Sequence, residues 1–260
     1  MAGRNNVVLV DADNTLWDTD TVFQNAQLLL LDRLESATGR NTSDVERLDF
    51  VRSYDQALAR THHLHLRYPP QLLVRAVEAA LSDVPKYLAA QKAISGDHSA
   101  VNGKLSQVEV DAIVAEYLLA LGHVPTLLPG VEEGVRRATE AGLELFVMTE
   151  GRIDKQRRFL EIHGLEPFFK GVWEITKERA QFDRIRVRFK ERQVVIIGDQ
   201  PDRDIAPAKA AGCTTILVPS RFKPSWQNAV DDPVPDYVGT DFLDAIRWCL
   251  RAGFMEADPA

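Results

Sequence analysis

The chain has 260 residues, of which 45% are hydrophobic and 27% charged, and its formal net charge is −7. This composition is typical of a globular protein with a sizeable core. The acidic balance argues against a nucleic-acid partner or a membrane surface, although a local pocket can still be positive and bind an anion. Two cysteines, Cys213 and Cys249, are too few for a disulfide framework. Without a signal-peptide pattern or an apolar run of about 20 residues, we expect a cytoplasmic protein.

The first predicted element is a strand at Val7–Val10, directly before Asp11. Four consecutive aliphatic residues are typical of a strand that is buried on both faces of a parallel sheet. No further strand is predicted before Leu143. In between, apolar residues recur at spacings of three and four, which predicts helices at 21–38, 43–66, 71–88 and 106–121. Segment 95–104 is predicted to be a loop by its composition.

Strands and helices alternate in the second half of the chain. Short aliphatic runs predict strands at 143–148, 194–197 and 215–218, and the stretches between them predict helices that end near Gly142, Gly164 and Gly212. This order is typical of a doubly wound α/β protein. We therefore predict a Rossmann-like parallel-sheet core at residues 1–17 and 125–260, with an inserted α-helical domain at 18–124.

Two carboxylates follow the first strand. Asp11 and Asp13 are two residues apart, a spacing that points both side chains to the same side while the chain stays extended. Ligands of open α/β sheets bind at this carboxyl edge. Two like charges so close are costly unless one is protonated or a cation neutralises them. Mg2+, which prefers oxygen ligands and suits phosphate chemistry, is the expected cation.

A second acidic group follows the strand at 194–197. Asp199 comes directly after Gly198 and is a candidate metal ligand from a neighbouring strand. Asp204 lies five residues further on, where it can cap the next helix, serve as an outer acid of the metal site, or do both. Asp202 is better interpreted as a solvated loop acid.

A candidate phosphate cradle follows the strand at 143–148. Thr149 offers a hydroxyl, and the backbone N–H groups of Glu150 and Gly151 open a helix, a combination that suits phosphate binding. Lys177 precedes a later helix. In the same crevice it would neutralise phosphate charge, whereas taken alone it would be an ordinary surface lysine.

These four motifs, in this chain order, resemble the haloacid dehalogenase (HAD) superfamily, and within it the phosphatases with a helical cap inserted after the first strand. The resemblance covers the core and implies an HAD-like α/β fold. It implies that Asp11 is the nucleophile that attacks phosphorus, while Asp13 protonates the leaving alcohol and later deprotonates water. It also implies that Thr149 and the following backbone bind the phosphoryl group and that Lys177 stabilises it.

The same resemblance implies that Mg2+ is held by Asp11, by Asp13 through its backbone carbonyl, and by Asp199, with Asp204 nearby. Asp13 favours phosphate esters over carbon–halogen bonds, because an alkoxide leaving group needs a proton and a halide does not. A haloacid dehalogenase or phosphomutase, and a non-catalytic binding protein on the same fold, are the alternatives. Glu150 departs from the family, which often has Asn there: either only its backbone is used, or its side chain meets a cation on the substrate.

The remaining expectations concern the substrate and partners. The inserted domain resembles a lid that covers a small ligand, so we expect a small phosphorylated metabolite and a monomer or homodimer. Histidines cluster at His62, His63 and His65, where a polar helix face is a simpler interpretation than a metal site. We hypothesise that some of this cluster, with Arg60 or Arg67, reads the substrate. The basic stripe at 184–190 is interpreted as a solvated helix.

Overall fold

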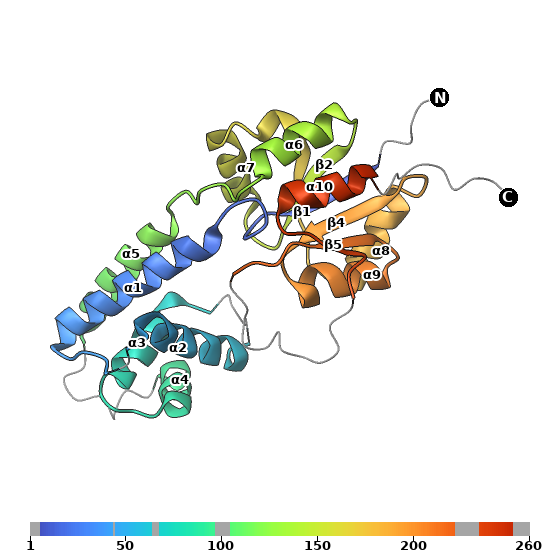
Figure 1. The fold of residues 1–260 in the computed structure, drawn as a ribbon. Coiled ribbons are helices and arrows are strands. Elements are labelled where there is room, and N and C mark those ends of the chain that lie inside the picture. The colour runs from blue at the N-terminus through green and yellow to red at the C-terminus, as the bar shows by residue number, and fades with distance from the viewer. Residues whose placement is uncertain (1–5, 44, 64–67, 97–104, 222–233, 252–260) are drawn as a thin grey trace. The chain divides into compact units, whose positions relative to one another are not determined.

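The computed structural model describes residues 6–43, 45–63, 68–96, 105–221 and 234–251. The chain forms two compact units: residues 1–20 together with 125–260, and residues 21–124 (Figure 1). Each unit has its own hydrophobic core and is described by itself.

The first unit is built on a parallel sheet. Its six strands lie in the order β3-β2-β1-β4-β5-β6, and they are β1 (Val7–Asp11), β2 (Glu144–Thr149), β3 (Phe169–Glu174), β4 (Val194–Gly198), β5 (Thr214–Leu217) and β6 (Tyr237–Val238). β1 pairs with β2 on one side and β4 on the other. Every residue of β1 and β4 is buried, as expected for aliphatic strands covered on both faces.

Helices cover both faces of this sheet. Figure 1 shows α6 (Val131–Glu140) and α10 (Phe242–Arg251) on one face, with α8 (Arg179–Arg188) and α9 (Ala206–Ala210) on the other. α7 (Ile153–Ile162) connects β2 to β3. Alternate residues of the strands supply the two faces, and Leu9, Met148 and Ile196 pack with Phe182 of α8 in one core. The predicted α/β parallel-sheet class is confirmed.

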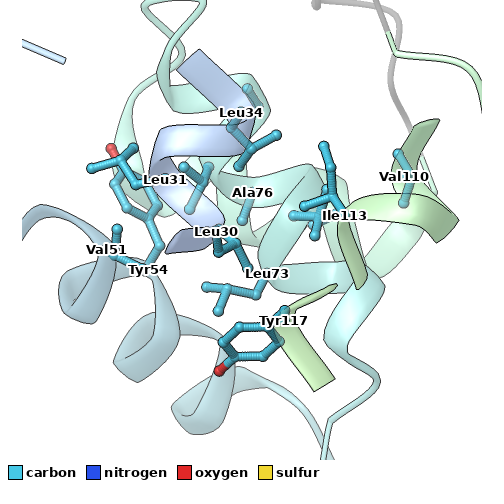
Figure 2. Packing of buried hydrophobic residues seen from close by; sticks show 14 of the residues in the cluster. Leu30, Leu31, Leu34, Val51, Tyr54, Leu73, Ala76, Val110, Ile113 and Tyr117 are labelled. Carbon is cyan, nitrogen blue, oxygen red and sulfur yellow. The ribbon is translucent and has the colours of Figure 1, made fainter. Parts of the chain in front are cut away.

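The second unit is helical within the part of the chain that is described. It contains α1 (Thr19–Thr38, which begins in the first unit), α2 (Arg47–Thr61), α3 (Pro70–Ala80), α4 (Lys86–Ser95) and α5 (Gln107–Leu121). Figure 2 shows side chains of α1, α2, α3 and α5 gathered in one core that includes Leu30, Leu34, Tyr54, Leu73 and Ile113. This core is separate from that of the sheet.

The helix predicted at 71–88 is wrong, because two helices occupy that region. α3 ends at Ala80, Asp83 adopts a positive φ of 62°, and Pro85 precedes α4. Proline has no backbone N–H and disfavours helical geometry in the residue before it, so it opens a helix rather than continuing one. The predicted loop at 95–104 falls mostly outside the described residues, as does the end of the helix predicted at 43–66.

None of the helices within the described ranges combines the length and apolarity that a membrane crossing requires.

The core of the helical unit gives a first prediction. Leu73 is fully buried in it, whereas Leu119 of α5 is 74% exposed. We expect Leu73→Ala to lower the free energy of unfolding by about 2–5 kcal/mol, because it removes buried methyl groups and leaves a cavity. The matched Leu119→Ala should change it by no more than about 0.5 kcal/mol. Urea denaturation followed by circular dichroism measures both, and equal losses would contradict the assignment of this core.

Candidate active site

Three neighbouring strands bring the predicted site residues to one edge of the sheet. Asp11 is the last residue of β1, Thr149 is the last of β2, and Asp199 follows the last residue of β4. In the parallel register Asp11 lies opposite Met148, and Val10 lies opposite Ile197. The carboxyl ends of the three strands are therefore level, and their polar residues meet in one place.

Lys177 is buried in this place and is not a surface lysine. Its Nζ donates to Asp11 Oδ1 at 2.6 Å and lies 2.7 Å from Asp204 Oδ1. Burial acts to lower the pKa of this ammonium group, but the carboxylates of Asp11 and Asp204 outweigh it and raise the pKa of Lys177 above its usual value. Lys177 therefore remains a cation at any physiological pH.

Three buried carboxylates surround the ammonium group of Lys177. Oxygens of Asp11, Asp199 and Asp204 all lie within 4.8 Å of one another. Burial raises the pKa of Asp11 well above its usual value against the opposing pull of Lys177. Burial and the charge of Asp204 likewise raise the pKa of Asp199 to about 7. The site thus holds more negative charge than Lys177 neutralises.

The donor set fits a hard divalent cation. Among the described residues, Asp199 Oδ1 is buried with no hydrogen-bond partner, which is a costly state for a carboxylate oxygen. Asp11, Asp199 and Asp204 offer only oxygen ligands, the kind that Mg2+ prefers. The carboxylate of Asp13 is not in this group, which leaves its backbone carbonyl as the predicted contact.

Asp204 lies within the turn Pro201–Ile205 and closes it, whereas its predicted part in a metal site stays a prediction. Its Oδ2 accepts from the backbone N–H of Gln200 at 3.0 Å, as a turn-capping carboxylate does, while its Oδ1 faces Lys177. The backbone of Gly198 packs directly against the side chain of Asp204, because a Cβ at Gly198 would lie 2.3 Å from Asp204 Cγ. Only glycine fits there. Asp202 is exposed, as predicted, but it lies in the π-helix Pro201–Ile205 and not in a loop.

Asp13 lies in the turn after β1 and is held by two donors. Its Oδ1 accepts from Thr19 Oγ1 at 2.8 Å, and its Oδ2 accepts from Gln156 Nε2 at 3.0 Å. Asn14, with a positive φ of 60°, receives a hydrogen bond from the backbone of Asp20. These roles of Thr19 and Gln156 were not predicted from the sequence. Gln156 lies in the middle of α7, and its sequence context carries no signal of this role.

Thr149 and Gly151 form the turn between β2 and α7. The hydroxyl of Thr149 is buried, accepts from the backbone N–H of Gly151 at 2.9 Å, and lies 3.4 Å from Gln156 Nε2. A Cβ at Gly151 would come within 3.2 Å of that hydroxyl. The N–H of Gly151 therefore holds the hydroxyl of Thr149 in place, and the phosphate-binding role of this turn stays a prediction.

The side chain of Glu150 meets a cation that belongs to the protein. Arg203 donates to both of its carboxylate oxygens, and the backbone N–H of Lys177 donates to Oε1 at 3.1 Å. Burial acts to raise the pKa of Glu150, but Arg203 and the Lys177 backbone outweigh it and the pKa is lowered. Of the two alternatives for Glu150, a backbone role alone or a cation on the substrate, neither includes Arg203, whose pairing with Glu150 was not predicted from the sequence.

The histidine cluster belongs to the helical unit. His62 is buried. The centroid of its ring lies 4.3 Å from that of His63 and 6.4 Å from that of Tyr68. Neither His62 nor His63 takes part in a group of three possible metal ligands within the described ranges. His65 and Arg67 lie outside those ranges, so the hypothesis that this cluster reads the substrate stays a prediction.

A family model for haloacid dehalogenase-like hydrolases matches residues 6–212. The chain belongs to that family. The match runs from the strand that carries Asp11 to the helix after Asp204, and so includes every residue of the site described above. The predicted membership and the predicted hydrolase class are confirmed.

Individual HAD-like relatives agree with this assignment. Over 106 residues the chain is 33% identical to glyceraldehyde 3-phosphate phosphatase of Methanocaldococcus jannaschii, a match that covers 37% of this chain and 44% of that protein. The match thus spans less than half of the relative's length. A haloacid dehalogenase-like hydrolase of Xanthomonas campestris has the same fold, with a TM-score of 0.61 at 20% identity over 95% of both chains. The HAD hydrolase YfnB of Bacillus subtilis, solved with magnesium, has a TM-score of 0.59 at 19% identity over 95% of this chain and 99% of that one.

The crowded carboxylates predict that the metal-free protein loses stability as pH rises. The pKa of Asp199 is about 7 in the folded chain against an ordinary 3.8. The folded state therefore binds the proton more tightly, and the resulting stability is complete below about pH 4 and lost as pH rises through about 7. Asp11 acts in the same direction. In EDTA, the free energy of unfolding should fall between about pH 5 and about pH 8.

The variant Asp199→Asn should flatten this dependence and be more stable than the wild type at about pH 8, because it removes one buried charge. Asp202→Asn is the matched control: it removes an exposed acid three residues away and should keep the wild-type slope. Urea titrations at the two pH values measure the slopes. Identical slopes for wild type and Asp199→Asn would show that Asp199 does not bear the shifted pKa.

Proposed function

We propose that this HAD-like hydrolase is a Mg2+-dependent phosphatase that hydrolyses a small phosphate monoester through an aspartyl-phosphate on Asp11. The observation that carries the proposal is the contact of Lys177 Nζ with Asp11 Oδ1 at 2.6 Å, inside a group of three buried carboxylates. A carboxylate held in this way has one oxygen fixed by a cation and the other left for attack on phosphorus.

Lys177 and Thr149 serve the transferred phosphoryl group. Lys177 stays charged and lies next to the attacking carboxylate, so it can stabilise the negative charge that the phosphoryl oxygens bring. The O–H of Thr149 and the backbone N–H of Glu150 supply hydrogen bonds to the same oxygens, while the N–H of Gly151 is donated to the oxygen of Thr149. These groups are fixed before substrate arrives, because the strands of the sheet position them.

Asp13 is the general acid and base of the reaction. Phosphate esters leave as alkoxides, so the reaction needs an acid beside the leaving oxygen, and the second step needs a base for the attacking water. Asp13 is two residues from Asp11 and is oriented by Thr19 and Gln156. Asp13 gives its proton to the leaving alcohol in the first step and takes a new one from the attacking water in the second, so the carboxylic acid is restored.

Asp11, Asp199 and Asp204, with the backbone carbonyl of Asp13, would hold the Mg2+. When bound, the cation neutralises the excess of carboxylate charge and the charge of the phosphate. The match to glyceraldehyde 3-phosphate phosphatase supports a small phosphorylated metabolite as substrate, and the helical unit would be its lid. We further expect a cytoplasmic monomer or homodimer.

The alternatives of the same superfamily make different use of Asp13. A dehalogenase releases halide and has no need of its proton, whereas a phosphomutase returns the phosphoryl group to a substrate hydroxyl. Asp11, Thr149, Lys177 and Asp199 are buried, and Asp13 is present two residues after Asp11. This set argues against a non-catalytic binding protein, because such a protein has no need of buried charges that are costly to fold.

Hydrolysis of p-nitrophenyl phosphate tests the proposal. We expect phosphate release by the wild type with Mg2+, its loss in EDTA, and a fall of at least about a thousandfold in Asp11→Asn, because the amide is a far weaker nucleophile. Asp13→Asn should lower the rate by about a hundredfold or more. Asp202→Asn, an exposed neighbour of the site, should behave as the wild type.

Two results would contradict the phosphatase. Hydrolysis that persists in Asp11→Asn would show that Asp11 is not the nucleophile. Release of chloride from 2-chloropropionate without Mg2+, with Asp13→Asn as active as the wild type, would establish a dehalogenase instead. A wild type inactive on p-nitrophenyl phosphate would next be tested on sugar phosphates and triose phosphates. Inactivity on all of them would contradict the proposal.

A further inference from the structure

The carboxylate of Glu150 joins three loops at the edge of the sheet. It follows β2, it accepts the backbone N–H of Lys177 from the loop after β3, and it binds Arg203 in the π-helical turn Pro201–Ile205 after β4. The guanidinium group donates Nε to Oε2 at 3.1 Å and Nη2 to Oε1. Such two-pronged pairs fix geometry as well as charge.

These contacts close a ring around Lys177. Glu150 holds the backbone N–H of Lys177, and Asp204 holds its Nζ. Arg203 precedes Asp204 directly in the chain and binds back to Glu150. Both ends of the lysine are thus tied to the same turn, through Glu150 at the backbone and through Asp204 at the ammonium group.

We infer that the Glu150–Arg203 ion pair is a positioning device for Lys177 in the reaction. The inference rests on the proposed function. A lysine has a long, flexible stem, so a fixed backbone alone does not determine where its ammonium group lies. By tying the Lys177 backbone to the turn that carries Asp204, the pair sets the place from which Nζ contacts Asp11. Misplacement of a catalytic group by about 1 Å can cost about a hundredfold in rate.

The carboxylate of Glu150 is committed to the protein. Both oxygens of Glu150 are taken by donors of the protein, so a cationic substrate group would have to displace Arg203. The side chains are 28% and 43% exposed, and ion pairs this accessible contribute little to stability. The pair therefore positions Lys177 more than it stabilises the fold, and its loss should lower kcat more than the free energy of unfolding.

The ion pair of Glu144 and Arg192 is a matched control. Its side chains are 29% and 23% exposed and 3.0 Å apart, and it also links the strands β2 and β4, at their other ends. We expect Glu150→Gln and Arg203→Gln each to lower kcat on p-nitrophenyl phosphate about tenfold or more, with KM changed less than about threefold. Glu144→Gln should leave both within about twofold of the wild type.

The double variant and a conservative variant sharpen the test. If the two residues act as one unit, Glu150→Gln with Arg203→Gln should be no slower than the slower single variant. Arg203→Lys keeps the charge and should recover part of kcat. A kcat of Glu150→Gln equal to that of Glu144→Gln, independent effects of the two residues, or a rise in KM alone, which would indicate substrate contact, would each overturn the inference.

A second measurement separates this inference from the proposed function. Hydrogen exchange of the Lys177 backbone amide, followed by NMR, needs no turnover. Exchange should accelerate about tenfold or more in Glu150→Ala, which removes the acceptor, and stay unchanged in Glu144→Gln. A wild type inactive on every phosphate ester tested, but with this exchange pattern, would refute the phosphatase and leave the structural link from Glu150 to Lys177 established. Unchanged exchange in Glu150→Ala would refute the positioning of Lys177 by the Glu150–Arg203 pair.

Discussion

The active site depends on the ion pairs that Lys177 makes with Asp11 and Asp204. Three carboxylates meet in a buried place where each raises the free energy of the others, and a single built-in cation opposes them. The ammonium group is tightly held because it is the only charge of its sign within contact distance of Asp11 among the described residues. The folded protein therefore keeps negative charge that Lys177 does not neutralise, and a divalent cation from solution would neutralise it.

The parallel sheet makes this crowding possible. β1 lies between β2 and β4, so Asp11 has a strand end on either side at the same level. Buried aliphatic strands cannot shift by one residue without turning their apolar side chains, and the register of the core therefore fixes the register of the site. Gly198 completes the arrangement, since any side chain there would collide with Asp204.

The sequence predicts those parts of the molecule that leave a local signal. Aliphatic runs such as Val7–Val10 locate the buried strands, and the polar residues that follow them locate the site. β3 was missed because Lys170 and Gly171 interrupt its apolar pattern, as an edge strand permits. Arg203 was missed because its partner, Glu150, is 53 residues away, and such a pairing is visible only once the chain has folded.

The division into two units explains why the sequence indicates the reaction class more clearly than the substrate. Asp11, Asp13, Thr149, Lys177 and Asp199 all belong to the unit with the sheet, where strand ends dictate their positions. The helical unit has its own apolar core and contributes none of them. Its polar surface is therefore free of the constraints that the chemistry imposes. Side chains free in this way can differ between relatives that share a reaction, so the proposed role of this unit as a lid that reads the substrate leaves no comparable pattern in the sequence.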